Sequence, residues 1–296
     1  MRSSLPVALR AMSPIAFQGE RGAFSEEAAR KLLGDTIDVL PCRTFDDVFA
    51  AVADGRADAA VVPIENTLAG SVLRNFELLA TAHLLIRGEV LLRIAHALIA
   101  PRGSAIADLR RVYSHPVALA QCQRFFAAHR GTIEAIAADD TAGSVRMVVE
   151  RAVAGEAAIA AAGAAAIYGA DVLIHGIEDH RENYTRFLLL TPESSSMKAT
   201  GGGARKTSLM FVAPNKPGSL FRALAAFALR EIDLMKIESR PIEGRPWEYA
   251  FYVDLAGDAD EPNVARAIDH LREMCEVVRL FGSYDAAFSE SGTKDV

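Results

Sequence analysis

The sequence of 296 residues has few cysteines, no metal-binding histidine pattern and no long apolar run, and each shortage excludes a class of protein. Its three cysteines, Cys42, Cys122 and Cys275, are far apart and form no C-x-x-C pair, so we expect neither a disulfide framework nor a zinc site. Isolated cysteines of this kind are typical of a reducing compartment. The seven histidines have no H-E-x-x-H or other ligand spacing, so we expect no metal and no cofactor.

The charge and the hydropathy of the chain exclude two kinds of partner. A net charge of -6, without any basic run, argues against nucleic acid. The first residues, MRSSLPVALRAMSP, lack the apolar core of a signal peptide, because Pro6 and Arg10 interrupt it. No segment approaches the ~20 apolar residues of a membrane helix. We therefore expect a cytoplasmic protein that binds neither nucleic acid nor a membrane.

A run rich in serine, glycine and threonine divides the chain into two domains. We place a flexible linker at 192–205, between a larger domain at 14–191 and a smaller one at 206–285. Upstream, strand-like segments such as IAFQ, AAVVPI, EVLLRIAHALIA and RFLLL alternate with helix-like ones, and Ser25 is a suitable N-cap for the first helix. This alternation predicts parallel sheets with ligand loops at the carboxyl ends of their strands. Because about 180 residues is generous for one open sheet, we expect two α/β lobes with a cleft between them.

The downstream segment has a simpler pattern. TSLMFVAP, DLMKIESRPI, YAFYVDLAG and EVVRLFGSY read as strands, PGSLFRALAAFALREI and PNVARAIDHLREMC read as helices, and EGRPW reads as a turn. The order is βαββαβ, which predicts a ferredoxin-like domain.

Two loops of the larger domain follow predicted strands and carry groups suited to ligands. Gly19 and Gly22 lie between a strand and a helix, where backbone amides favour an anion, although an ordinary strand–helix loop has the same letters. Glu65, Asn66 and Thr67 follow a buried strand, either at a ligand crevice or as a polar loop that caps the next helix.

Two further stretches combine hydroxyl groups with other polar side chains. In YSHPVALAQC, Ser114 and His115 are neighbours on a strand and point to opposite faces, so they are unsuited to act as a hydrolase pair. We expect His115 to be a structural, hydrogen-bonded group. In NYTRFLLL, Thr185 and Arg186 precede an apolar strand, which either emerges into solvent there or delivers a hydroxyl and a guanidinium into a cleft.

Taken together, these blocks resemble the prephenate dehydratase family over about residues 15–284. GERGAFSEEA, VPIENTLAGS, YSHPVALAQC, AAIAAAGAAAIYG and NYTRFLLL occur in the family's order. The C-terminal part is similar to the family's phenylalanine-sensing ACT domain, with ESRP intact and PGSLF where relatives often have G-A-L-V. The resemblance implies a two-lobed fold like that of periplasmic binding proteins. It also implies an enzyme, a hydro-lyase that converts prephenate to phenylpyruvate with loss of carbon dioxide and water.

The family's motifs imply roles for individual residues. Thr185, from T-R-F, would donate to the departing hydroxyl group, and Asn66 and Gln121 match the active-site amides. Val117 stands where many relatives have glutamine, so we assign the role of the active-site amide in this stretch to Gln121. Arg186 would face away from Thr185 on a strand and could pair with an acid instead of substrate. The substrate-binding residues implied by the resemblance are Ser25, Glu65, Thr67, Ser114 and Arg186.

The ACT resemblance implies binding of phenylalanine between two such domains, and hence a homodimer or homotetramer. The effector-binding residues that it implies are Gly218, Ser219, Leu220, Glu238, Ser239, Arg240 and Pro241. A structural dimerisation module is the alternative for this domain.

Two alternatives to prephenate dehydration stay open. The substrate could be arogenate, which differs from prephenate only at the side-chain keto or amino group. The protein could also be a non-catalytic small-molecule sensor with an ACT domain. With about 14 residues before the first predicted strand, we expect no chorismate mutase segment.

Overall fold

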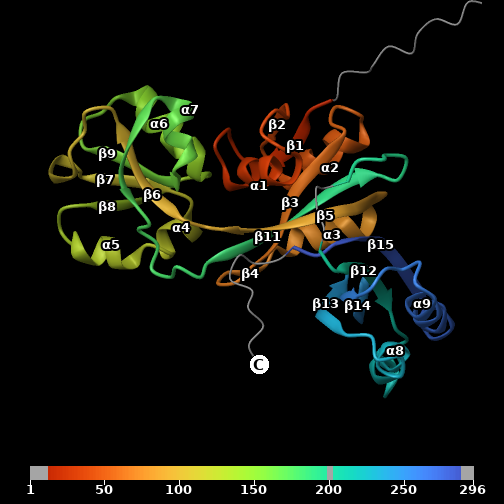
Figure 1. The fold of residues 1–296 in the computed structure, drawn as a ribbon. Helices are drawn as coiled ribbons and strands as arrows, with labels where there is room; N and C mark the ends of the chain where they lie inside the picture. The colour runs from red at the N-terminus through yellow and green to blue at the C-terminus, as the bar shows by residue number, and fades with distance from the viewer. Residues whose placement is uncertain (1–12, 199–202, 288–296) are drawn as a thin grey trace, which may run out of the picture.

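The structure is a computed structural model that describes residues 13–198 and 203–287. These residues form two lobes and a C-terminal domain, each built on its own sheet (Figure 1). The predicted linker includes 199–202, which lie outside the described residues, as does most of the N-terminal stretch considered above as a signal peptide. Among the described residues, no helix is both long and apolar enough to cross a membrane.

The first lobe contains the beginning of the chain and one strand that returns from the second lobe. Its elements are β1 (Ile15–Gln18), α1 (Phe24–Leu33), β2 (Val39–Cys42), α2 (Phe45–Ala53), β3 (Ala59–Asn66), β4 (Gly70–Ser71), α3 (Leu73–Thr81), β5 (Leu84–Arg93) and β11 (Tyr184–Pro192). The sheet order is β2-β1-β3-β11-β5, with β4 paired to β3. β1, β2 and β3 run parallel, whereas β11 is antiparallel to both β3 and β5.

The second lobe is formed by the segment between β5 and β11. Its elements are β6 (His96–Pro101), η1 (Ile106–Asp108), β7 (Arg111–Ser114), α4 (Pro116–Ala120), α5 (Gln123–Ala128), β8 (Glu134–Ala137), α6 (Thr141–Arg151), β9 (Glu156–Ala161), α7 (Gly163–Tyr168) and β10 (Ala170–His175). The sheet order is β10-β6-β9-β7-β8. β7 is parallel to β8 and β9, and β6 is antiparallel to β9 and β10.

The prediction of parallel sheets is therefore wrong for β6 and β11, each of which runs antiparallel to both of its neighbours, and the connections explain why. The chain passes from β5 to β6 and from β10 to β11 without a helix, so these segments carry it between the lobes (Figure 1). Parallel neighbours need a long crossover, and these direct passages remove that constraint. The stretch EVLLRIAHALIA, expected to be one strand, is divided between the lobes at Ile94 and Ala95.

The first helix begins earlier than predicted. Ala23 is its N-cap, without a side-chain cap, and Ser25 lies inside the first turn rather than at the cap. The Glu26 carboxylate accepts a hydrogen bond from the Gly22 amide at 2.8 Å and pairs with Arg30 at 2.7 Å. Burial raises the pKa of Glu26, but these bonds outweigh it and hold the pKa below its ordinary value. The loop before α1 is thus tied to the helix that follows it.

The C-terminal domain has the predicted βαββαβ order. It contains β12 (Arg205–Val212), α8 (Ser219–Ala228), β13 (Leu234–Ile242), β14 (Arg245–Ala256), α9 (Pro262–Met274) and β15 (Val277–Asp285), with sheet order β13-β14-β12-β15. The expected turn EGRPW is shorter than predicted, because β14 already begins at Arg245. The combination of two α/β lobes with this domain confirms the predicted fold class.

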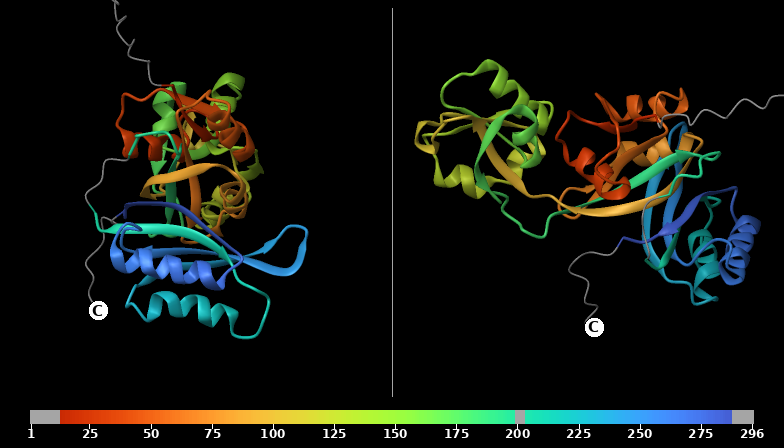
Figure 2. Two further views of the ribbon diagram at one scale, coloured as in Figure 1. Left: turned by 90° about the vertical axis from the view of Figure 1, so that its right-hand side faces the viewer. Right: turned by 45° about the horizontal axis from the view of Figure 1, so that its top comes forward.

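The sheet of the C-terminal domain is covered on both faces. The helices α8 and α9 pack on the face that includes Leu209 and Phe211 (Figure 2). The other face, which includes Met210 and Tyr252, shares a core with Phe76 of the first lobe. The two domains touch so closely that a Cβ at Gly282 would lie 2.5 Å from the Ile86 carbonyl oxygen. The C-terminal domain is therefore packed against the first lobe rather than suspended from a linker.

Candidate functional site

The polar start of β11 pairs in register with the polar end of β3. Thr185 lies opposite Asn66, and Arg186 lies opposite Glu65. Because neighbouring side chains on a strand point to opposite faces, the two pairs face in opposite directions. Thr185 shares its face with Phe187, which packs in the core beneath α1. The arginine shares its face with the core joined to the C-terminal domain.

A chain of hydrogen bonds starts at Thr185 and runs across both lobes. The Asn66 Nδ2 group lies 2.9 Å from Thr185 Oγ1 and 2.7 Å from Asn183 Oδ1. Asn183 Nδ2 donates to Gln121 Oε1 at 3.0 Å, and His96 Nε2 lies 2.9 Å from the same oxygen. The three residues predicted to be catalytic therefore belong to one connected network, although they are far apart in sequence.

The backbone fixes the polarity of this network. Asn66 Oδ1 accepts from the amides of Leu68 and Ala69 at 2.9 and 2.7 Å, so the nitrogen of this side chain must face Thr185 and Asn183. Thr185 Oγ1 is then an acceptor toward Asn66, and its own hydrogen stays available as a donor. Gln121 Oε1 receives two hydrogen bonds, which leaves the Gln121 NH2 group as a donor too. The network thus presents a donor at each end.

Two adjoining cavities lie at the junction of the lobes, and the first of them reaches this network at His96. One, of about 560 Å³, is lined by His96 and Tyr184 together with the cationic side chains Arg93 and Arg181. The other, of about 540 Å³, shares Arg93 with it and reaches the start of α1. Arg93 pairs with Glu178 at 2.6 Å. Thr185 is 7% exposed and does not line either cavity directly.

The glycine loop before α1 brings the two lobes into contact. A Cβ at Gly22, where φ is +85°, would lie 2.8 Å from the Ala164 Cα of α7. The Tyr168 hydroxyl donates to the Arg21 carbonyl at 2.9 Å. These contacts favour the ordinary-loop alternative over an anion site: the glycine is needed for close approach of the lobes.

Several predicted substrate-binding residues have other partners. Ser114, predicted to line the cleft, is fully buried in this structure and donates to the Ile159 carbonyl at 2.6 Å. The Thr67 hydroxyl donates to the Glu182 carbonyl and accepts from the Tyr184 amide, which anchors the segment leading into β11. Ser25 is buried in the first turn of α1.

His115 has the structural role expected for it. It is the N-cap of α4, and its Nδ1 atom accepts from the Val117 amide at 3.3 Å.

Arg186 and Glu65, also predicted to bind substrate, lie on the face of β3 and β11 opposite the network. Arg186 contacts Glu65, Glu89 and Asp254 at 2.9, 2.6 and 2.6 Å. Burial raises the pKa of Asp254, but the Arg186 guanidinium, together with Ser208 and Lys206, outweighs it and holds that pKa below its ordinary value. Arg186 therefore pairs with acids, the alternative that strand alternation allowed, and joins the first lobe to the C-terminal domain.

This ion cluster extends to the ESRP motif of β13. Lys236 pairs with Glu65 and, at 3.6 Å, with Glu238. Glu238 also accepts from the Ser71 hydroxyl at 2.7 Å and pairs with Arg240 at 2.5 Å. One predicted effector residue, Glu238, is therefore linked through Lys236 to Glu65 on the strand that carries Asn66.

The other predicted effector residues lie at the start of α8 and along β13. Gly218, with φ of 78°, is the N-cap of α8, and Ser219 and Leu220 form its first turn. Ser239 and Pro241 are exposed on β13, which is an edge strand of the sheet.

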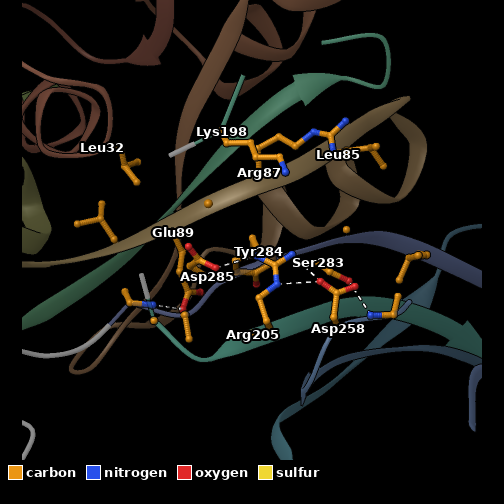
Figure 3. Close-up of a pocket in the computed structure, with 18 of the residues that line it drawn as sticks. Leu32, Leu85, Arg87, Glu89, Lys198, Arg205, Asp258, Ser283, Tyr284 and Asp285 are labelled. Carbon is orange, nitrogen blue, oxygen red and sulfur yellow. Dashed lines mark hydrogen bonds and ion pairs between the residues drawn. The ribbon is translucent and has the colours of Figure 1, made fainter. Parts of the chain in front are cut away.

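A third cavity lies between the first lobe and the C-terminal domain and is a separate feature (Figure 3). It has a volume of about 640 Å³ and lies between β5 and the strands β12 and β15. Arg205 crosses it to pair with Asp258 and Asp285 at 2.7 and 2.8 Å. Its lining contains no residue of the hydrogen-bond network.

Sequence analysis missed two members of the network, Asn183 and His96. Asn183 is fully buried, and His96 is 2% exposed. Asn183 directly precedes the polar start of β11, which was a usable signal. His96 had no signal, because it sits inside a stretch that read as one continuous strand.

The comparisons agree on one family. Residues 15–195 match the family model described as prephenate dehydratase, and residues 207–273 match the model described as ACT domain. The chain is 42% identical over 281 residues to "Arogenate dehydratase/prephenate dehydratase 2, chloroplastic" of Arabidopsis thaliana, which covers 91% of this chain and 72% of that protein.

Two solved structures are similar over nearly the whole chain. One is prephenate dehydratase from Arthrobacter aurescens in complex with L-Phe, with 33% identity and a TM-score of 0.84 over 92% of this chain and 90% of that one. The other is GqqA, described as a novel type of quorum quenching acylase, with 36% identity and a TM-score of 0.83 over 92% of this chain and 97% of that one.

Proposed function

The chain belongs to the prephenate dehydratase family, and on that premise we propose that it converts prephenate to phenylpyruvate by decarboxylating dehydration. The observation that carries the proposal is the polarity of the network: Asn66 turns the Thr185 hydroxyl into a donor. The reaction needs a donor of this kind, because hydroxide is a poor leaving group.

In the proposed reaction the ring carboxylate leaves as carbon dioxide. The electron pair of its bond moves into the ring, and the hydroxyl at C4 departs with its bonding electrons. The Thr185 hydrogen bond stabilises the charge that develops on this oxygen, and uptake of one proton gives water. The group that supplies this proton need not be Thr185 itself, since an aliphatic hydroxyl is a weak acid.

The remaining groups would hold the two carboxylates of the substrate. The Gln121 NH2 group is a donor at the other end of the network. Arg93 and Arg181 line the adjoining cavity together with Glu178 and Glu182, and Arg93 is paired with Glu178. Fixed donors and cations that are already in place stabilise a developing charge without having to reorganise.

We propose phenylalanine as the effector, bound by the C-terminal domain in a homodimer or homotetramer. The Arthrobacter aurescens relative, which was solved with L-Phe, supports this. The test is light scattering with and without phenylalanine. A monomer that does not respond would contradict the assignment. A cytoplasmic location is likewise proposed, and cell fractionation tests it, because one plant relative is named as chloroplastic.

Arogenate is the second candidate substrate, and the names of the plant relatives favour it. The deciding experiment compares kcat/KM on prephenate and on arogenate with the same enzyme. A ratio that favours arogenate by orders of magnitude would replace prephenate. Failure to turn over either substrate above the spontaneous rate would favour the sensor.

An acylase activity, as named for GqqA, has less support in this site. Acyl transfer needs a nucleophile that can pass its proton to a base. Thr185 has Asn66 as its partner, which donates to it, and Ser114 is held by a carbonyl oxygen. Incubation with an amide substrate of acylases, followed for release of the acyl group, is the control that excludes or establishes this activity.

A further inference from the structure

His96 is the one ionisable side chain in the network, and its buried ring has one unpaired nitrogen. Its Nε2 atom lies 2.9 Å from Gln121 Oε1, whereas its Nδ1 atom is buried without a partner among the described residues. The ring also packs edge-on against Phe24 of the first lobe, at 5.6 Å between centroids. The side chain therefore contacts both lobes at the point where the chain crosses between them.

The tautomer of His96 follows from the rest of the network. The backbone fixes Asn66, Asn66 fixes Asn183, and Asn183 Nδ2 then requires an oxygen at Gln121. An oxygen that faces His96 Nε2 at 2.9 Å requires a hydrogen on that nitrogen. The ring is therefore the neutral Nε2–H form, with an unprotonated Nδ1.

The surroundings oppose a second proton on the ring. A hydrogen on Nδ1 would be buried without an acceptor, which costs free energy. Burial lowers the pKa of His96, and it outweighs the Gln121 hydrogen bond and the charge of Glu178.

We propose that His96 is a positioning residue: its Nε2–H holds the Gln121 amide with the NH2 group directed toward the substrate. This rests on the proposed dehydration at the Thr185 site. Without the His96 hydrogen bond, Gln121 Oε1 keeps only Asn183 as a partner. The amide can then rotate and place its oxygen, instead of a donor, toward a carboxylate.

Two substitutions separate this role from simple packing. Glutamine at position 96 can keep an N–H donor where histidine has Nε2, whereas asparagine can place one only near Nδ1. We expect His96→Gln to stay within about threefold of wild-type kcat/KM and His96→Asn to lose about tenfold, the value of one orienting hydrogen bond. His83→Asn, at the opposite end of β5, is the control and should leave turnover unchanged.

The tautomer is tested without any substrate. NMR of 15N-histidine-labelled full-length protein at neutral pH distinguishes protonated from unprotonated ring nitrogens, and loss of one signal pair in His96→Gln assigns the ring. A protonated Nε2 with an unprotonated Nδ1 is expected. A protonated Nδ1, or equal losses of activity in the two variants, would overturn the proposal. If wild-type protein turned over neither substrate, the proposed function would fail, while the NMR result would still decide the tautomer.

Discussion

Replacing Thr185 by valine removes the hydroxyl and little else. Valine has nearly the same shape as threonine, so at this buried position the main change is the loss of the hydroxyl group. Asn66 Nδ2 keeps two acceptors, Asn183 Oδ1 at 2.7 Å and the Tyr184 carbonyl at 3.1 Å. No buried donor is orphaned, and we expect a loss of only about 1 kcal/mol in the free energy of unfolding.

The same substitution should be far more costly for the reaction. Removing one hydrogen-bond donor from a site of developing negative charge lowers kcat by about 10²–10³-fold. If the group also transfers the proton, its removal lowers the rate by about 10²–10⁴-fold. We therefore expect kcat of Thr185→Val to fall at least about a hundredfold, with KM little changed. Thr185→Ser keeps the hydroxyl and should retain activity within about tenfold, because only the methyl contacts that orient it are lost.

The assay is formation of phenylpyruvate from prephenate, followed by absorbance in alkali, with thermal unfolding measured in parallel. The serine variant controls for disturbance of the strand. If valine left turnover within about threefold of wild type, the hydroxyl would have no role in the step that limits the rate.

Three further predictions use contacts at the edges of the site. Gly22→Ala places a methyl group against Ala164 of the other lobe, so we expect the lobes to separate, with a larger radius of gyration in X-ray scattering and a higher KM. The control is Gly34→Ala, which also has a positive φ, of +93°, but open space around it, and which should show neither change. Lys236→Met breaks the ionic link between the ESRP motif and Glu65. The change in activity caused by phenylalanine should therefore shrink by about fivefold or more, while activity without phenylalanine persists. An unchanged response to phenylalanine would show that this link does not carry the effect of phenylalanine to the site. Burial raises the pKa of Glu65, but its bonds to Lys236 and Arg186 outweigh burial and leave the pKa lowered. The stabilisation of the fold by the ionised Glu65 is therefore present above about pH 4.5 and is lost as the pH falls through the lowered pKa. Glu65→Gln should unfold more easily than wild type at pH 7 and lose less stability on acidification, and parallel stability curves of the two proteins would contradict this.

The element types of both domains could be predicted from the sequence, because helix and strand patterns are local, whereas the roles of the motif residues stay predictions that the family resemblance implies. Alternation along β11 was enough to predict that Arg186 faces away from Thr185 and pairs with acids. Ser114 could not be placed, since its acceptor, the Ile159 carbonyl, belongs to a strand 45 residues further along the chain. His96 was missed for a related reason: its role depends on which atom of Gln121 faces it, and a backbone contact at Asn66 decides that orientation.

The β3–β11 pair places two functions one residue apart. Thr185 and Asn66 face the network, and their neighbours Arg186 and Glu65 face the ion cluster of the C-terminal domain. Because both pairs belong to one strand ladder, a twist or shift of the strand pair would move both faces together. Lys236 links Glu65 to Glu238, so a displacement of β13 would act on the strand that holds Asn66 without crossing the interior of the lobe. A control site on this domain therefore needs only to tilt two strands to alter the donor at Thr185.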